Sequence, residues 1–584
     1  MYLDMASKTL LALIIVIIVI AGIAGYYLAT RPAPTTTTPT TPTTTPTETT
    51  TSPATTPSTE VKRILRTGWA FPTYIDPAIG RDFSSATAHT NIYDPLVWPT
   101  RNGSVKPWVA INWTVSDDGL VWTFKIRPGI KFHSGRELTA EDVAFSMKRL
   151  LTIGQGYAFI FEPYVEDAVA LDKYTVQFKL KKPFGPFLIA LTRLYIVDKE
   201  EVLAHIKKPG PYGEYGDFAT EWMLYHDAGS GPYMVAEVKP EEYIRLVKFE
   251  DYWNKEAFAP YAPDEVLMLP TAGNPAKEMA MLAKRELEIG DAWVPYEMLA
   301  EMDKIEGVDI AEYVMPYAVY IMLNTKKPPL DDIHVRKALA YAFDYDAVIK
   351  EIFPGAIKGE GPIPKVLPGW CPVDGYERDL DKAIEELKKS KYYPDIVQNP
   401  DKYVIEFWWV AEVPAEEKLA LLFAKCASEI GLKVKVVKTP WSKVVEYSAK
   451  VETSPHIFPL MNIPAYPDAA YTLEAKYHSS SAHTYVQNEW LLNETLDKWI
   501  ESAISELDPE KRLQMYCEIH RYIASIYVTI VPANLKLMRP YQAYYVDWPQ
   551  ARDPSTVIPE IGYEMVFREI QVFPEKRAEL LQQG

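Results

Sequence analysis

An uncharged apolar run near the start of the chain divides the sequence into parts that must fold in different surroundings. Leu10–Ala29 has about 20 residues without a charge, which is enough for a helix to span a bilayer. The run is long for the apolar core of a signal peptide, and no clear Ala-x-Ala cleavage site precedes Tyr26. We predict that residues 1–31 are a membrane anchor or a signal segment. Either reading places the rest of the chain outside the cytoplasm.

Residues 32–60 consist almost entirely of Thr, Pro and Ser. A segment of this composition buries too little apolar surface to fold, and when fully extended it would reach about 90 Å. We predict a stalk that carries O-linked glycans; a plain tail without a role is the alternative. Sequons at Asn102, Asn112 and Asn493 agree with an extracellular glycoprotein.

The composition of the chain excludes some classes of function. Its 61 Lys and Arg residues and 78 Asp and Glu residues give a formal net charge of -17, whereas nucleic-acid binding needs a basic surface. With 584 residues, 48% of them hydrophobic, the chain is long enough for more than one core. Its three cysteines, Cys371, Cys426 and Cys517, form no CxxC pair. Two alternatives remain for them, one disulfide with a free thiol or three buried thiols.

Strand and helix patterns alternate from Val61 onward, which indicates an α/β chain of more than one lobe. Leu120–Ile126 alternates, with Trp122, Phe124 and Ile126 on one face. Three helices have clear signals. A capping box of Thr139 and Asp142 predicts a helix over Ala140–Leu151. An apolar stripe of Val335, Ala338, Leu339 and Ala342 predicts a second, and Asp508-Pro509 predicts the start of a third that runs to about Ser525.

No motif for catalysis or for a cofactor stands out. The sequence has no GxSxG, HExxH or GxxxxGK[ST] motif and no convincing dinucleotide fingerprint. His478 and His483 are separated by SSSA, a spacing that does not pair two metal ligands on a helix. Because no nucleophile, base and oxyanion donor come together, we predict a protein that is not an enzyme and has no cofactor or metal.

The order of several short motifs is more informative. They are RTGWAFPTYIDPAIG from Arg66, NIYDPLV from Asn91, the stretch from Val105 to Leu150, GSGPYMV from Gly229, VKFEDYWN from Val247, LNTKKPPLDDIHVRKALAYAFD from Leu323 and DPEKRLQMYCEIHRYI from Asp508. Together they resemble the peptide- and nickel-type (family 5) extracytoplasmic solute-binding proteins of ABC importers. The resemblance covers about Val61 to Asp547, and its most specific part is Val121–Leu150.

This resemblance implies a two-lobed, periplasmic-binding-protein-like α/β fold of type II, with an extra domain on the first lobe. The first lobe would comprise residues 61–318, the second lobe 319–532, and the return segment with the C-terminal tail 533–584. The chain would cross between lobes near Pro316–Asn324 and return near Ile530–Leu535. The implied function is to capture a small molecule between closing lobes and to deliver it, as a monomer, to the permease subunits in the membrane.

The residues that match the family's ligand site depart from the pattern of its peptide binders. Many of those proteins place an Asp before an aromatic residue in the second lobe, where it accepts the ligand's amine. The matching stretch here, Met461–Tyr471, has Ala465 before Tyr466, and Asp468 matches a different family position. An ammonium without an acidic partner is costly to bury, so this departure disfavours a peptide.

Aromatic residues occupy these stretches instead. The predicted ligand-binding residues are Trp69, Phe71, Tyr74, Trp408, Trp409, Asn462, Tyr466 and Asp468. Flat rings stack on sugar faces, so an oligosaccharide is the first hypothesis and a peptide the second. For a peptide, Asp468 or Glu412 would have to take the amine. Neighbours on a strand point to opposite faces, so one of Trp408 and Trp409 is expected to be core.

Two other functions are compatible with the anchor and the stalk. One is an anchored extracellular hydrolase, and the other is a structural or adhesion protein of the cell surface. The Val121–Leu150 motif supports neither of these functions, because it resembles the solute-binding proteins. The arrangement of anchor and stalk also resembles that of archaeal binding proteins.

Overall fold

The computed structural model describes residues 61–71, 73–374, 377–411 and 413–583. The predicted anchor and stalk lie outside these residues. Within them, no helix is both long enough and apolar enough to cross a bilayer.

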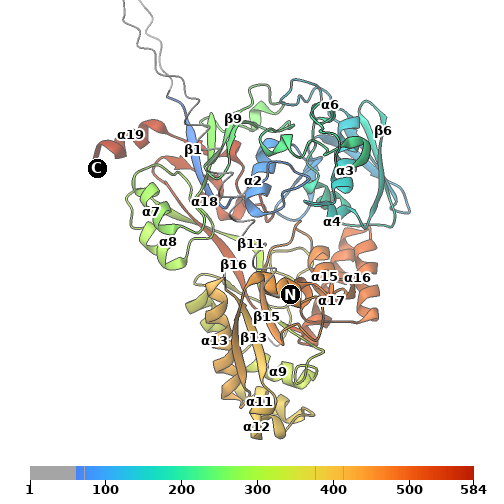
Figure 1. The fold of residues 1–584 in the computed structure, drawn as a ribbon, viewed down its shortest axis with the longest axis vertical. Coiled ribbons are helices and arrows are strands. Elements are labelled where there is room, and N and C mark those ends of the chain that lie inside the picture. Colours follow the sequence, from blue (N-terminus) through green and yellow to red (C-terminus); the bar gives the residue numbers. More distant parts are fainter. Residues whose placement is uncertain (1–60, 72, 375–376, 412, 584) are drawn as a thin grey trace, which may run out of the picture. The chain divides into compact units, whose positions relative to one another are not determined.

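Two four-stranded sheets organise the part that we call the first lobe, in the upper half of Figure 1. One sheet has the order β1-β10-β9-β8, in which only β1 and β10 are parallel. The other is antiparallel, with the order β4-β5-β7-β6, and α3 packs on it. The elements are β1 Ile64–Trp69, α2 Phe83–Ile92, β2 Val97–Pro99, β3 Val105–Pro107, β4 Ala110–Val115, β5 Val121–Ile126, α3 Ala140–Ile153, α4 Ala158–Phe161, β6 Val165–Asp172, β7 Thr175–Leu180, α5 Phe187–Ala190, α6 Lys199–Ala204, β8 Tyr233–Lys239, β9 Tyr243–Lys248, β10 Glu265–Pro270, α7 Pro275–Ala283 and α8 Tyr296–Met302.

A six-stranded sheet with the order β12-β16-β11-β15-β13-β14 organises the second lobe. Its strand β13 is buried along nearly its whole length, as expected for a strand that is covered on both faces. The elements are α9 Ile333–Ala342, α10 Tyr345–Ala347, β12 Ile357–Lys358, α11 Leu380–Lys389, α12 Asp395–Gln398, β13 Ile405–Val410, α13 Pro414–Glu429, β14 Val434–Thr439, α14 Trp441–Tyr447, β15 Ile457–Asn462, α15 Ala469–Tyr477, α16 Glu494–Ser505 and α17 Pro509–Ser525.

Two long antiparallel strands, β11 (Asp309–Leu323) and β16 (Thr529–Tyr541), run between the lobes in the centre of Figure 1. Their pairing shifts register between Val314 and Tyr317, around Pro316, which has no amide hydrogen to donate. Ile289 bridges both Thr67 of β1 and Tyr541 of β16, so the first-lobe sheet is continuous with this pair of strands. The stretches predicted for the crossings belong to these strands, Pro316–Leu323 to β11 and Ile530–Leu535 to β16, and the positions of the crossings stay a prediction.

After β16 the chain ends on the first lobe. It forms β17 Val546–Asp547, α18 Pro549–Arg552, β18 Gln571–Val572 and α19 Pro574–Gln583. The two short strands pair with each other.

Several local predictions are confirmed. The capping box of Thr139 and Asp142 opens α3, which ends at Gly154 in the left-handed conformation, φ 68°. Asp508 caps α17 by accepting from the amides of Glu510 and Lys511. The apolar stripe of α9 is buried, as is the predicted inner face of β5.

The cysteines form one disulfide and leave one free thiol, which is one of the two predicted alternatives. Cys371 and Cys517 form a disulfide with a Cα–Cα distance of 5.6 Å, and Cys426 is a buried free thiol. The bridge spans 146 residues of sequence and ties the segment after β12 to α17.

Candidate functional site

One side of the boundary between the lobes is buried and closely packed. The Arg193 Nε donates to the Ala465 carbonyl at 2.5 Å, and the Tyr164 hydroxyl donates to Glu474 of α15 at 2.8 Å. The Gly185 amide donates to the Ile504 carbonyl of α16 at 2.8 Å. A side chain at Gly185 would not fit, because a Cβ there would lie 2.2 Å from the carbonyl oxygen of Glu506. The first lobe therefore contacts α16 directly through the backbone and contacts α15 and Ala465 through the side chains of Tyr164 and Arg193.

The side where α8 faces α13 is different. There Glu297 of α8 and Lys418 of α13 form a salt bridge at 3.4 Å, with side chains 72% and 57% exposed. Exposed pairs contribute at most about 1 kcal/mol. Separating the lobes on this side therefore costs less than on the α15 side.

A row of large side chains crosses the boundary, and we call it the boundary wall (Phe83, Trp293, Tyr317 and Met461). The Trp293 ring lies edge-on to Phe83 at 6.2 Å and to Tyr317 at 5.9 Å between centroids. The Tyr317 hydroxyl lies 3.7 Å from the Met461 sulfur of β15. Trp293 is 48% exposed. A half-exposed Trp between the partly buried Phe83 and the buried Tyr317 is a typical contact surface for a ligand.

Two buried carboxyl groups lie beside Trp293. The Asp291 amide donates to Glu278 Oε1 at 2.9 Å, and the Trp293 amide donates to Asp291 Oδ2 at 3.3 Å. Burial raises the pKa of both groups, that of Glu278 to about 7, and the nearby charge of Asp291 adds to the rise at Glu278. Burial therefore favours the protonated form of both groups.

Arg539 of β16 supplies the nearest positive charge to these carboxyl groups. Its Nη1 donates to the Gly290 carbonyl at 2.8 Å, and its guanidinium lies 4.3 Å from the ring centroid of Trp69 and 5.6 Å from that of Phe83. The side chain is fully buried. It therefore stabilises the packing of Trp69 and Phe83 in the first lobe. Its positive charge also acts through space to lower the pKa of Asp291, against the rise that burial causes.

The predicted residues of the first loop are divided between core and surface. Trp69 is buried, donates from Nε1 to Thr67 Oγ1 at 2.6 Å and lies under Arg539. Phe71 is half-buried against the core. Tyr74 is 39% exposed. Only Tyr74 and Phe71 thus keep surface that a solute can touch.

The two neighbouring tryptophans of β13 are both buried. Trp409 packs in the main core, with Lys438 5.1 Å from its ring centroid. Trp408 donates from Nε1 to Glu406 at 3.2 Å and is covered by Lys443 at 5.1 Å. Because they are neighbours on a strand, the two rings point to opposite faces. Lys438 covers the ring of Trp409, and Lys443 covers that of Trp408.

The remaining predicted residues surround the start of α15. Asn462 is half-buried at the end of β15, opposite Ala318. Tyr466 is buried edge-on against Phe184 and Tyr471. Asp468 caps α15 by accepting from the Ala470 amide at 2.8 Å, and burial raises its pKa. Whether these residues contact a ligand stays a prediction. Glu412 lies outside the described residues.

Sequence reasoning missed Phe83, Trp293, Tyr317 and the acids beside Trp293. No periodic pattern marks them. Trp293 follows a loop whose place is fixed by pairing of Ile289 with strands far away in the sequence. The only local signal is a Trp in a polar, helix-starting stretch, DAWVPYE.

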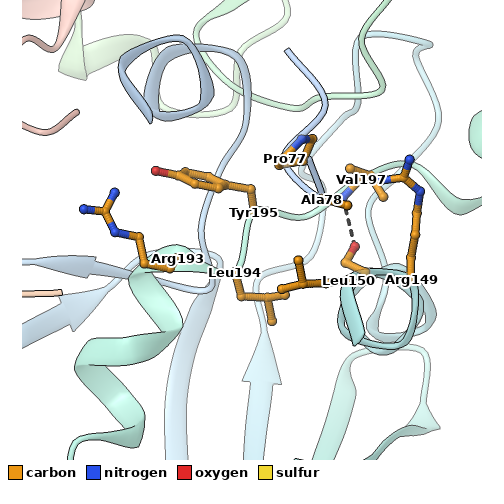
Figure 2. Close-up of a pocket in the computed structure, with 9 residues that line it drawn as sticks. Pro77, Ala78, Arg149, Leu150, Arg193, Leu194, Tyr195 and Val197 are labelled. Carbon is orange, nitrogen blue, oxygen red and sulfur yellow. Dashed lines mark hydrogen bonds between the residues drawn. The ribbon is translucent and has the colours of Figure 1, made fainter. Parts of the chain in front are cut away.

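Two hollows lie within the first lobe rather than at the boundary. The smaller is a cavity of about 10 Å³, lined by residues that include Ala78, Arg149 and Tyr195. Figure 2 shows that the side chains of Arg193 and Arg149, which also line it, lie on opposite sides and point away from each other. This cavity has room for about one water molecule. The larger, of about 400 Å³, is lined by residues such as Tyr544, Trp548 and Phe573 near α18 and α19. Neither contains residues of both lobes.

Comparison with known proteins agrees with this architecture. The family described as "Bacterial extracellular solute-binding proteins, family 5 Middle" matches residues 104–484. The probable D,D-dipeptide-binding periplasmic protein of Escherichia coli K12 is 27% identical over 480 residues, covering 80% of this chain and 88% of that protein. The dipeptide-binding protein of the same organism is 26% identical over 433 residues, covering 68% of this chain and 75% of that protein.

A solved structure shares the fold. The periplasmic binding protein DppA of Helicobacter pylori, in complex with the peptide STSA, superposes with a TM-score of 0.68 at 23% identity, covering 87% of this chain and 98% of that chain. The shared fold and the family match over most of the globular part lead to one conclusion. The chain belongs to the family 5 extracellular solute-binding proteins of ABC importers, which bind solutes and are not enzymes.

Proposed function

We propose that this protein captures a short peptide between its two lobes and delivers it to a permease. The observation that carries the proposal is the match to two relatives named for dipeptides along 88% and 75% of their lengths. The boundary supports it chemically. A peptide carries apolar side chains, and the boundary wall offers a half-exposed aromatic surface for them at Trp293.

The oligosaccharide hypothesis has less support. It depended on rings that would stack on a sugar, but Trp69, Trp408, Trp409 and Tyr466 are between 1% and 7% exposed. Neither of the two relatives is named for a sugar. We therefore place the peptide first.

The N-terminal segments fit this role as part of the proposal. Leu10–Ala29 would anchor the protein, and residues 32–60 would form a glycosylated stalk. A tether keeps a receptor near its transporter at high effective concentration. We place the lobe boundary at the irregular stretch of β11 around Pro316 and at the facing part of β16.

The test is calorimetric titration of the full-length protein with dipeptides and tripeptides, and in parallel with cellobiose and maltose. Peptides should bind and the disaccharides should not. Trp293→Ala should weaken peptide binding by about tenfold, because a large apolar contact is lost. Tyr261→Ala, which removes an equally exposed ring (49%) elsewhere on the first lobe, should leave the affinity unchanged. Binding of a disaccharide alone would refute the proposal.

A further inference from the structure

A second pair of aromatic rings meets across the boundary between the lobes, where α4 lies beside α15 (Figure 1). Phe159 of α4 lies edge-on to Tyr471 of α15, with 6.3 Å between the ring centroids. Phe159 is 38% exposed and Tyr471 is only partly buried, so both rings keep surface that a solute can touch. Because the rings belong to different lobes, a molecule that contacts both is held between the lobes.

The guanidinium of Arg81 lies beside these two rings. It is 5.6 Å from the ring centroid of Phe159, and its charge acts on the hydroxyl of Tyr471 in the other lobe. Burial raises the pKa of Tyr471 to about 12, and the charge of Arg81 acts against this rise. In sequence, Arg81 comes two residues before Phe83 of the boundary wall. Arg81 therefore lies where the two lobes meet.

The donors of Arg81 are free for a ligand. The side chain is exposed, and among the described residues its guanidinium forms no salt bridge and donates no hydrogen bond. The neighbouring Asp82 is used as the cap of α2, because it accepts from the Ser85 amide at 3.0 Å and from the Ser85 hydroxyl at 2.5 Å. A guanidinium is a planar fork of N–H donors that matches the two oxygens of a carboxylate.

The other cations described above at the boundary are engaged. Arg193 is fully buried and pairs with Glu560 at 2.9 Å. Arg539 is fully buried and donates to a backbone carbonyl, and Lys418 is paired with an acid of α8. Of these four cations, only Arg81 is both exposed and without an acidic partner. An anionic group that enters between the lobes can pair with Arg81 without the loss of an existing ion pair.

We propose that Arg81 binds the C-terminal carboxylate of the captured peptide, with the rings of Phe159 and Tyr471 on either lobe beside it. The peptide's free C-terminus is then a determinant of specificity, and the first lobe supplies the group that recognises it. This inference rests on the proposed function, because it names a residue that selects a peptide within the same site.

The test compares the affinities of the full-length protein for Ala-Phe and for its C-terminal amide, which has no carboxylate. The same pair made from the tightest dipeptide of the calorimetric series replaces them if Ala-Phe is not the peptide bound. The wild type should bind the free acid at least about tenfold more tightly, as expected for a charge-assisted, bidentate pair. Arg81→Gln should bind the acid and the amide with similar affinity. Arg81→Lys should keep part of the preference, because it retains the charge but not the planar fork.

Lys182→Gln is the matched control. Lys182 is another exposed cation, with its Nζ 4.6 Å from the ring centroid of Tyr164, and Tyr164 also contacts the second lobe. Its loss changes the net charge by the same amount as Arg81→Gln. This variant should keep the wild-type preference for the free acid.

The outcomes separate the two proposals. If the wild type binds no peptide, the proposed function fails and this assignment fails with it. If the wild type binds acid and amide equally, or if Arg81→Gln keeps the preference for the acid, only the assignment is overturned. A crystal structure of the wild type with the dipeptide gives an independent measurement. It should place the peptide carboxylate about 3 Å from the Arg81 guanidinium, and a carboxylate elsewhere would overturn the assignment.

Discussion

At the scale of single residues, the first lobe has more buried acid than buried base near the lobe boundary. Glu560 pairs with Arg193 at 2.9 Å, yet burial still raises its pKa to about 7. Glu564 is raised to about 6 by the same cause. Buried carboxyl groups of this kind prefer the protonated form, so their state changes with pH in the neutral range.

Glu278 offers the clearest pH test. Its folded-state pKa of about 7 lies above the ordinary 4.5, so its contribution to stability is complete below pH 4.5 and is lost as the pH rises through 7. The loss for a shift of this size is about 3 kcal/mol. Denaturant unfolding of the peptide-free protein at pH 5 and pH 8 measures it.

Variants isolate the contribution of Glu278 from those of Glu560 and Glu564. In Glu278→Gln the difference between the two pH values should shrink by about 2–3 kcal/mol. Glu286→Gln changes an exposed carboxylate nearby and should leave the difference as in the wild type. An equal difference in all three proteins would show that Glu278 is ionised at both pH values.

At the scale of elements, local chemistry made some segments predictable and left others hidden. The starts of α3 and α17 follow from caps within three residues of the helix, so the sequence was sufficient to place them. Trp408 and Trp409 were placed on opposite faces by the alternation of a strand, but the lysines that cover them come from β14 and α14. Trp293 reaches the boundary only through pairing of Ile289 with two distant strands, which no local pattern reveals.

The disulfide between the segment after β12 and α17 should stabilise the second lobe. Closing a chain of 146 residues restricts the unfolded state, and removal of such a bridge costs about 2–5 kcal/mol. The double variant Cys371→Ser, Cys517→Ser should show this loss in denaturant unfolding. Cys426→Ser, at the buried free thiol, is the matched control for a change of sulfur to oxygen that breaks no bridge. Equal stability of the double variant and the wild type would contradict the expectation.

At the scale of the whole described domain, the boundary has a buried side at α15–α16 and an exposed side at α8–α13. Opening on the exposed side and retention of the buried contacts would let a solute enter without loss of the contact between lobes. The fold class and the presence of two lobes were predictable from the order of motifs. The difference between the buried and the exposed side of the boundary was not predictable from the sequence. It depends on single close contacts between distant segments of backbone, such as that of Gly185 with Glu506.

Gly185→Ala tests the buried side. Its Cβ would lie 2.2 Å from the Glu506 carbonyl oxygen, so α16 must move away from the first lobe. We expect the peptide affinity to fall by about tenfold and the radius of gyration from small-angle X-ray scattering with peptide to increase. Unchanged scattering and affinity would mean that this contact is absent from the loaded form.

The bridge formed by Ile289 has a consequence for signalling to the transporter. The loop that carries Asp291 starts one residue after Ile289, and the Gly290 amide also donates to the Pro540 carbonyl of β16 at 2.7 Å. Strand β16 continues into the sheet of the second lobe. Strand β16 therefore connects this loop directly to the sheet of the second lobe. We expect a solute that moves this loop to move β16 with it, so that the loaded and the empty protein would differ at surfaces remote from the solute.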